Sequence, residues 1–143
     1  MDFSHLKKFD IKGNTAEFVL DDIEVEPAPI LILKPATQSN RKYFNALLKG
    51  SGTRLSRIKR AKIDEKVYED NLKEDKKLYP EHVIVGWKNV TDTSGKEVSF
   101  NKQNCISFVE QLPDWIFEKV RNFAATNENF VEEQMDAEEV SKN

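Results

Sequence analysis

Two short β-prone runs near the N-terminus constrain the fold of this chain most. They are Ala16–Leu20 and Pro29–Leu33, and both consist largely of bulky apolar residues. The intervening Asp21–Asp22 pair and Pro27 oppose a helix. We therefore expect a β-hairpin or a small sheet within residues 11–36. The alternation over Glu24–Glu26 is compatible with a third strand.

Prolines restrict how these strands can pair. Proline has no amide hydrogen to donate to a strand ladder, so Pro27, Pro29 and Pro35 favour positions at a sheet edge. Leu31 and Ile32 would then lie on an edge strand. An exposed edge can recruit a further strand, so these two residues are candidates for binding a partner or a second copy.

The region after the strands has the pattern of helices. Ser39 can cap a helix over residues 40–49, because its hydroxyl can accept hydrogen bonds from first-turn amides, and Gly50 supplies a stop. Apolar residues line one face of this helix: Tyr43, Phe44, Leu47 and Leu48. The charged stretch 53–78 predicts a thinly buried helix. Pro80 then permits a new helix from Glu81 to about Lys88.

Two more helices are predicted further along the chain. Thr93–Gly95 has the composition of a turn, and a short extended piece follows it. Asn101 is a suitable N-cap for a helix over 102–112, and Pro113 starts another that ends near Ala125. Their apolar positions recur at helical spacing: Cys105, Ile106, Phe108, Val109 and Leu112, then Ile116, Phe117, Val120 and Phe123.

These elements predict an α+β fold, with a small N-terminal β-hairpin or sheet followed by a mostly α-helical domain. A chain of 143 residues suits one domain. We place it at residues 1–130, β-rich over 11–36 and helical over 39–130. Residues 131–143 are acidic with few apolar positions, and we expect a flexible tail.

Charge and cysteine content restrict the class of protein. The net charge of −3 gives no general attraction to phosphate backbones or anionic membranes. The single cysteine, Cys105, excludes an internal disulfide and a multi-thiolate metal site. Residues 1–12 lack the apolar core of a signal peptide, and Pro29–Leu33 is far too short to span a bilayer. We expect a cytoplasmic protein without a membrane partner.

Few residues have the pattern of a catalytic or cofactor site. Gly50–Gly52 lacks the following Lys-Ser/Thr of a phosphate-binding loop, and the carboxylates lack calcium-loop spacing. We therefore expect no cofactor, no metal and no enzyme. One alternative stays open, because folding could bring His82 beside Cys105 as a nucleophilic pair. The other interpretation of Cys105 is a packed thiol on an apolar helix face.

A basic cluster before the charged helix allows a second alternative. Its five cations lie within nine residues and could neutralise phosphates: Arg54, Arg57, Lys59, Arg60 and Lys62. The acidic residues that follow, from Asp64 to Asp75, would repel a nucleic-acid backbone. The cluster therefore fits a small nucleic-acid-binding regulator, a solvated helix face or a site for an acidic protein.

The C-terminal half carries a more specific pattern. A tryptophan stands before a turn, a short extended piece leads into a helix cap, a Leu-Pro pair separates two helices, and an Asn-Phe element closes the region. These features occupy Gly86–Asp92, Ser94–Asn101, Asn104, Leu112–Trp115, Arg121–Ala124 and Asn127–Phe130. In this order they resemble the tail assembly chaperone family of long-tailed, siphovirus-type bacteriophages.

The resemblance implies a function based on binding other proteins. Members of this family act in the infected host cytoplasm, coat the tape measure protein, help to recruit tail tube subunits and leave before the virion is complete. The resemblance also implies self-association, and often a longer frameshifted form. Codons for Ser141–Asn143 could contain the slippery heptamer that such a frameshift needs.

Aromatic residues are the first candidates for the binding surface. Trp87, Trp115 and Phe117 belong to the residue types that dominate interface hot spots, although the same side chains also suit a core. Another phage structural or connector protein is the nearest alternative function. The nucleic-acid-binding regulator and the His82–Cys105 enzyme are more distant ones.

Overall fold

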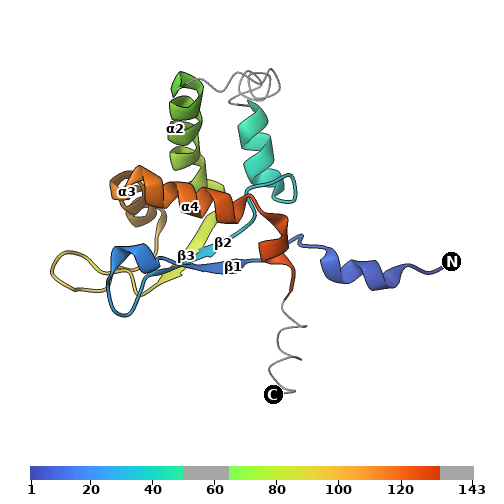
Figure 1. Cartoon of the computed structure of the whole chain (residues 1–143), viewed down its shortest axis with the longest axis horizontal. Coiled ribbons are helices and arrows are strands. Elements are labelled where there is room, and N and C mark those ends of the chain that lie inside the picture. Colours follow the sequence, from blue (N-terminus) through green and yellow to red (C-terminus); the bar gives the residue numbers. More distant parts are fainter. Residues whose placement is uncertain (50–64, 133–143) are drawn as a thin grey trace, which may run out of the picture.

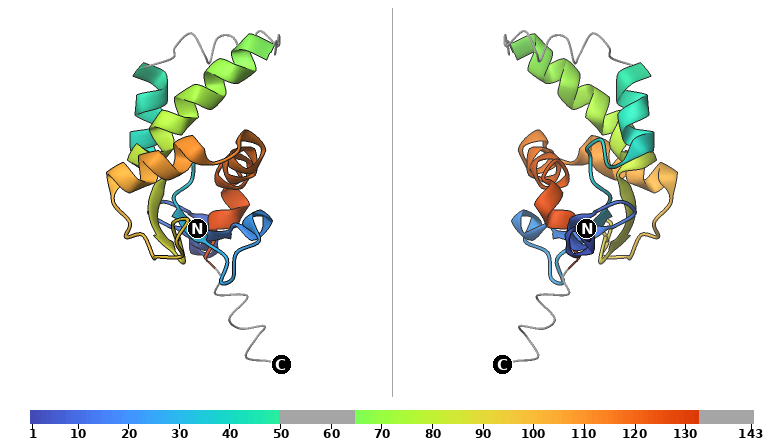
Figure 2. Two further views of the ribbon diagram at one scale, coloured as in Figure 1. Left: turned by 90° about the vertical axis from the view of Figure 1, so that its left-hand side faces the viewer. Right: turned by 90° about the vertical axis from the view of Figure 1, so that its right-hand side faces the viewer.

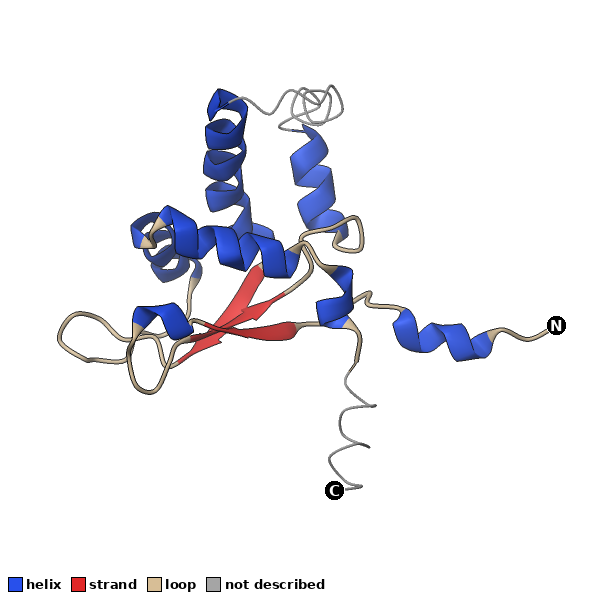
Figure 3. Ribbon diagram, in the orientation of Figure 1, coloured by secondary structure: helices blue, strands red, loops and turns tan. Residues whose placement is uncertain are grey.

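The protein folds as a small antiparallel sheet with helices packed on one of its faces (Figure 1, Figure 3). The structure, a computed structural model, describes residues 1–49 and 65–132. The sheet holds three strands in the order β1-β2-β3. The predicted α+β class is therefore confirmed. The basic cluster at 54–62 and the acidic residues 133–143 lie outside the described residues.

The predicted hairpin is present. β1 (Ala16–Val19) pairs antiparallel with β2 (Ile30–Leu33), with Ala16 opposite Leu33. The third strand expected at 24–26 is wrong. A short 3-10 helix, η2 (Asp21–Ile23), occupies this connection, and Glu24 follows it with a φ of 59°. That left-handed conformation breaks the extended alternation which a strand requires.

The third strand comes from much further along the chain. β3 (Ile84–Lys88) pairs antiparallel with β2, so the helix predicted over Glu81–Lys88 is wrong. The preceding helix, α2 (Glu65–His82), continues through Pro80 in its last turn instead of restarting there. Because β2 lies between two strands, the prediction that Leu31 and Ile32 belong to an edge strand is also wrong.

Local signals placed most of the helices correctly. Asn101 caps α3 (Lys102–Gln111), and its side chain accepts a hydrogen bond from the Asn104 amide at 2.8 Å. Pro113 precedes α4 (Asp114–Ala124). The helix over residues 41–49 is present, but Ser39 is not its cap. Asn40 takes that position, since its side-chain oxygen accepts from the Tyr43 amide at 3.3 Å.

The core lies between the sheet and the helices. The inward side chains of β2 are completely buried, and α3 and α4 contribute apolar faces to the same cluster: Leu31, Leu33, Cys105, Val109, Phe117, Val120 and Ala124. Phe130 of η3 (Asn127–Phe130) closes one end. None of the described helices is both long enough and apolar enough to cross a membrane.

A buried polar network joins three helices. Asp75 of α2 is 3% exposed and accepts hydrogen bonds from the Tyr43 hydroxyl at 2.8 Å and from Arg121 Nε of α4 at 2.9 Å. Burial alone would lower the pKa of Arg121, but the charges of Asp75 and Glu118 raise it. The network fixes helix 41–49 and α2, which stand side by side with α3 and α4 below them (Figure 2).

Removing the Asp75 carboxylate should destabilise the fold strongly. Asp75→Ala removes the buried carboxylate that accepts from the Tyr43 hydroxyl and pairs with Arg121 Nε, so we expect a loss of about 3 kcal/mol in the free energy of unfolding. Urea denaturation measures this loss. Glu69→Ala, at an exposed position of the same helix, is the control and should change stability by less than about 0.5 kcal/mol. Equal stability of both variants would contradict the network's role.

Candidate functional site

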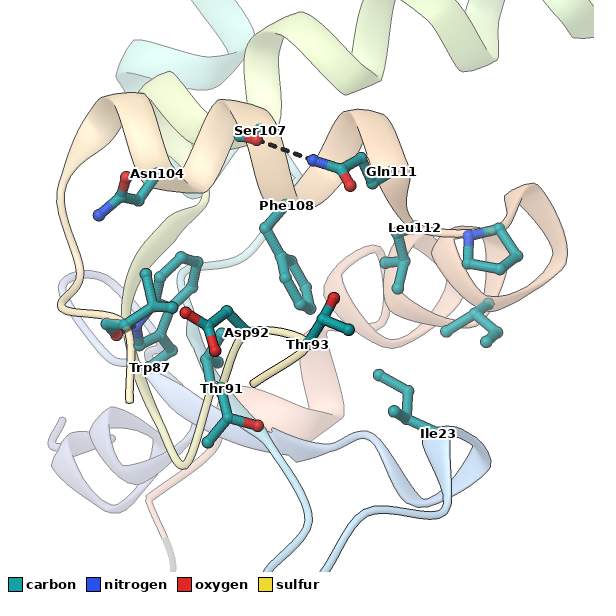
Figure 4. A pocket seen from close by; sticks show the side chains of 14 residues that line it. Ile23, Trp87, Thr91, Asp92, Thr93, Asn104, Ser107, Phe108, Gln111 and Leu112 are labelled. Carbon is teal, nitrogen blue, oxygen red and sulfur yellow. Dashed lines mark hydrogen bonds between the residues drawn. The ribbon is translucent and has the colours of Figure 1, made fainter. Parts of the chain in front are cut away.

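An apolar groove lies between α3 and the loop that leads into it (Figure 4). Its volume is about 520 Å³, within the usual range of ligand sites. The lining comes from β3, from the loop after β3, from α3, from the start of α4 and from η2. These residues are Ile23, Trp87, Val90, Thr91, Asp92, Thr93, Val98, Asn104, Ser107, Phe108, Gln111, Leu112, Pro113 and Ile116.

Two aromatic rings contribute to the apolar wall of the groove. Trp87 is half-buried, and its indole Nε1 donates to the Val98 carbonyl at 2.9 Å. Its ring packs against Phe100 and Phe108, with centroid distances of 5.1 and 5.4 Å. This packing fixes the position of the tryptophan. Trp87 and Phe108 therefore form a rigid apolar surface at the groove.

A tight turn shapes the loop side of the groove. Oδ1 of Asp92 accepts hydrogen bonds from the Ser94 amide, the Ser94 hydroxyl and the Lys96 amide at 2.6–3.0 Å. The Ser94 hydroxyl, and then the Lys96 amide, lower the pKa of Asp92. Gly95 completes the turn with a φ of 84°, as the sequence predicted. Asp92 is the one ionisable side chain among the lining residues.

The far end of the groove is built from η2 and α4. Ile23 and Ile116 contribute apolar side chains there. The ammonium group of Lys119 lies 3.0 Å from the Asp22 carboxylate, which ties η2 to α4. The same group lies 5.4 Å from the ring centroid of Trp115. Trp115 is 57% exposed and directly precedes the lining residue Ile116 on α4, so a large aromatic side chain is exposed close to the groove.

The structure separates the five residues predicted to bind a partner. Leu31 and Phe117 are completely buried in the core. Ile32 points to the opposite face of the sheet, which the alternation along β2 requires. Trp87 lies in the groove and Trp115 near its end. Only the two tryptophans therefore belong to this region of the surface.

Sequence reasoning missed the groove itself. Phe108 belongs to the predicted apolar stripe and packs against the core, but it also lines the groove, about 100° from Val109 around the helix axis. The apolar stripe of this helix is wider than contact with the core requires, and this width is a signal in the sequence for a second contact surface. Ile23 gave no signal, because it follows two aspartates in a connection between strands.

Comparison with known families decides the origin of the chain. The model of the YdaY prophage protein family matches residues 38–143, which is well over half of the chain. The chain belongs to the YdaY prophage protein family. It is therefore a phage-derived protein, as the resemblance implied. No curated protein and no solved structure matches it.

The groove lies almost entirely within the region that matches the YdaY prophage protein family. Every lining residue except Ile23 falls inside the matched region, whereas the first two strands and the N-terminal segment lie before it. The groove is therefore built almost entirely from the part of the chain that defines its family membership.

The proposed His82–Cys105 pair receives no support from the geometry. Cys105 is completely buried, which confirms the interpretation as a packed thiol. Burial raises the pKa of the Cys105 thiol to about 12, so the reactive thiolate is strongly disfavoured. Among the described residues, no three His, Cys, Asp or Glu side chains gather in a way that could hold a metal ion.

The thiol should be unreactive in the folded protein. We expect Cys105 to resist alkylation by iodoacetamide at pH 8 and to react fully in 8 M urea, with mass spectrometry as the readout. Its burial stabilises the fold below the ordinary thiol pKa of 9.0, and this stabilisation falls as pH rises toward about 12. Rapid alkylation of the native protein would contradict the assignment.

Proposed function

We propose that this protein is a phage tail assembly chaperone that binds the tape measure protein and helps to recruit tail tube subunits. The observation that carries the proposal is the apolar groove with its wall of Trp87 and Phe108. Membership of a prophage family provides the biological setting. The family resemblance seen in the sequence provides the specific role.

The chemistry of the groove suits an amphipathic helix. A helix of this kind places its apolar stripe in a hydrophobic groove and leaves its polar flanks at the edges. Here the apolar wall is bordered by Thr91 and Thr93 on the loop side and by Asn104, Ser107 and Gln111 on α3 (Figure 4). These uncharged side chains can donate to and accept from the flanks of a bound helix.

A tape measure protein presents such helices over a great length. Its apolar stripe would aggregate if it stayed exposed, so many small subunits that each cover one segment would keep it soluble. Trp115 extends the contact surface beyond the groove, because an exposed tryptophan supplies a large apolar area with few rotatable bonds.

The proposed activity requires no catalysis. The protein would act in the host cytoplasm, bind by covering apolar surface, and be absent from the finished virion. If the protein were instead a structural or connector protein of the particle, it would be present in the finished virion. Mass spectrometry of purified particles therefore separates the two roles, and its detection there in stoichiometric amount would contradict the chaperone role.

Blocking the groove should abolish binding of the tape measure protein. Ser107→Arg places a long charged side chain at an exposed lining position, where it crosses the space that an apolar stripe needs. We expect the affinity for co-expressed tape measure protein to fall at least tenfold, about 1.4 kcal/mol. Pull-down followed by isothermal titration calorimetry measures it.

A matched control lies on the same helix. Gln103→Arg adds the same charge at an exposed position that does not line the groove. It should bind the tape measure protein as the unchanged protein does. Equal binding by the Ser107→Arg and Gln103→Arg variants would show that the client does not use the groove.

A further inference from the structure

An apolar arm projects from the body of the protein at its N-terminus. Residues 1–10 are all exposed, and η1 (Ser4–Phe9) contains no buried residue. Phe3, Leu6 and Phe9 are 58%, 54% and 55% exposed. Residues three apart lie above one another in a 3-10 helix. Leu6 and Phe9 therefore share one face of η1, and Phe3 precedes them at the N-cap with the same spacing in the sequence.

The root of the arm is held firmly while the stripe stays free. Ile11 is 5% exposed and belongs to the core, and the Asn14 side-chain amide donates to the Phe130 carbonyl at 2.9 Å. These contacts fix the start of the arm beside η3. From there the arm points away from the body, at the end of the molecule opposite to the loop that borders the groove (Figure 1).

We infer that the arm of one copy binds in the groove of a second copy. The arm offers three large apolar side chains in a row, and the groove offers an apolar wall of Trp87 and Phe108. The arm leaves from the opposite end of its own body, so the accepting groove belongs to another molecule. The partner is a second copy of this chain.

The charges around the two surfaces are complementary. Lys7 and Lys8 lie between Leu6 and Phe9 on the arm, and Asp2 and Asp10 lie near its two ends. The groove carries Asp92, whose hydrogen bonds keep it ionised, and exposed Asp21 lies two residues from the lining residue Ile23. The ammonium groups beside the apolar stripe can therefore pair with the carboxylates beside the groove.

The geometry of this contact determines the type of assembly. The arm and the groove are different surfaces, so their association is head-to-tail. An open assembly then has a free arm at one end and a free groove at the other. Such a contact gives a ring or an open chain of subunits. The inference rests on the groove being a protein-binding site, as in the proposed function, and makes the arm a competitor of the client there.

Two complementary variants test the inference without any client. In the arm variant, Phe3, Leu6 and Phe9 are all changed to Ser, whereas the groove variant is Ser107→Arg. The unchanged protein should associate with increasing concentration in sedimentation velocity. Each variant alone should stay monomeric, while an equimolar mixture should form 1:1 dimers and nothing larger, because one intact arm and one intact groove remain.

Three outcomes would overturn the inference. These are a monomeric unchanged protein at the highest concentration, an arm variant that still associates, and a mixture that stays monomeric. Val25→Ser, at an exposed apolar position outside both surfaces, is the control and should associate like the unchanged protein. Circular dichroism of each variant establishes that it is folded before mixing.

Client binding distinguishes this inference from the proposed function. The arm variant keeps its groove, so it should bind the tape measure protein at least as tightly as the unchanged protein does. Complementation of the two variants without client binding would uphold the arm contact and reject the chaperone role. Binding of the tape measure protein without complementation of the two variants would reject the arm contact and uphold the chaperone role.

Discussion

The pairing of β2 with β3 is the interaction on which the rest of the structure depends. It joins residues 30–33 to residues 84–88, with Leu31 opposite Trp87. A two-stranded hairpin is at best marginally stable in water, and a third strand with a covered face gives it independent stability. The same pairing holds Trp87 in place, and with it the loop and the helix that enclose the groove.

The covered face of the sheet explains why the groove is open. Leu31 and Leu33 fill the space beneath α3 and α4, so both helices pack through Cys105, Val109, Phe117 and Val120. Phe108 lies to the side of that stripe and turns toward Trp87 instead. Because the loop after β3 is held by its own turn at Asp92, it does not collapse onto Phe108. The groove is therefore formed before a partner arrives.

Features set by neighbouring residues could be predicted from the sequence. The hairpin, the turn at Gly95, the Asn101 cap and the helix restart at Pro113 each depend on a few adjacent residues, and all are present. The strand β3 could not be predicted in this way. Its apolar run begins a few residues after Pro80, and a short run of this kind fits a helix or a strand equally well until its pairing partner is known.

The residues predicted to bind a partner also show that local sequence does not determine which side chains are exposed. Trp115 and Phe117 are two residues apart on one helix, yet one is 57% exposed and the other completely buried. Only the rotation of α4 against the sheet decides between them, and that rotation depends on contacts with distant residues. The groove draws on η2, β3, α3 and α4 together, so no single stretch of sequence contains it.

Hydrogen–deuterium exchange with and without the tape measure protein tests the central claim, that the groove is the surface which binds the client. Binding should slow exchange in residues 89–98 and in α3, which form the two sides of the groove. Unchanged exchange in both segments, with slowing confined to α2 or to the hairpin, would contradict it.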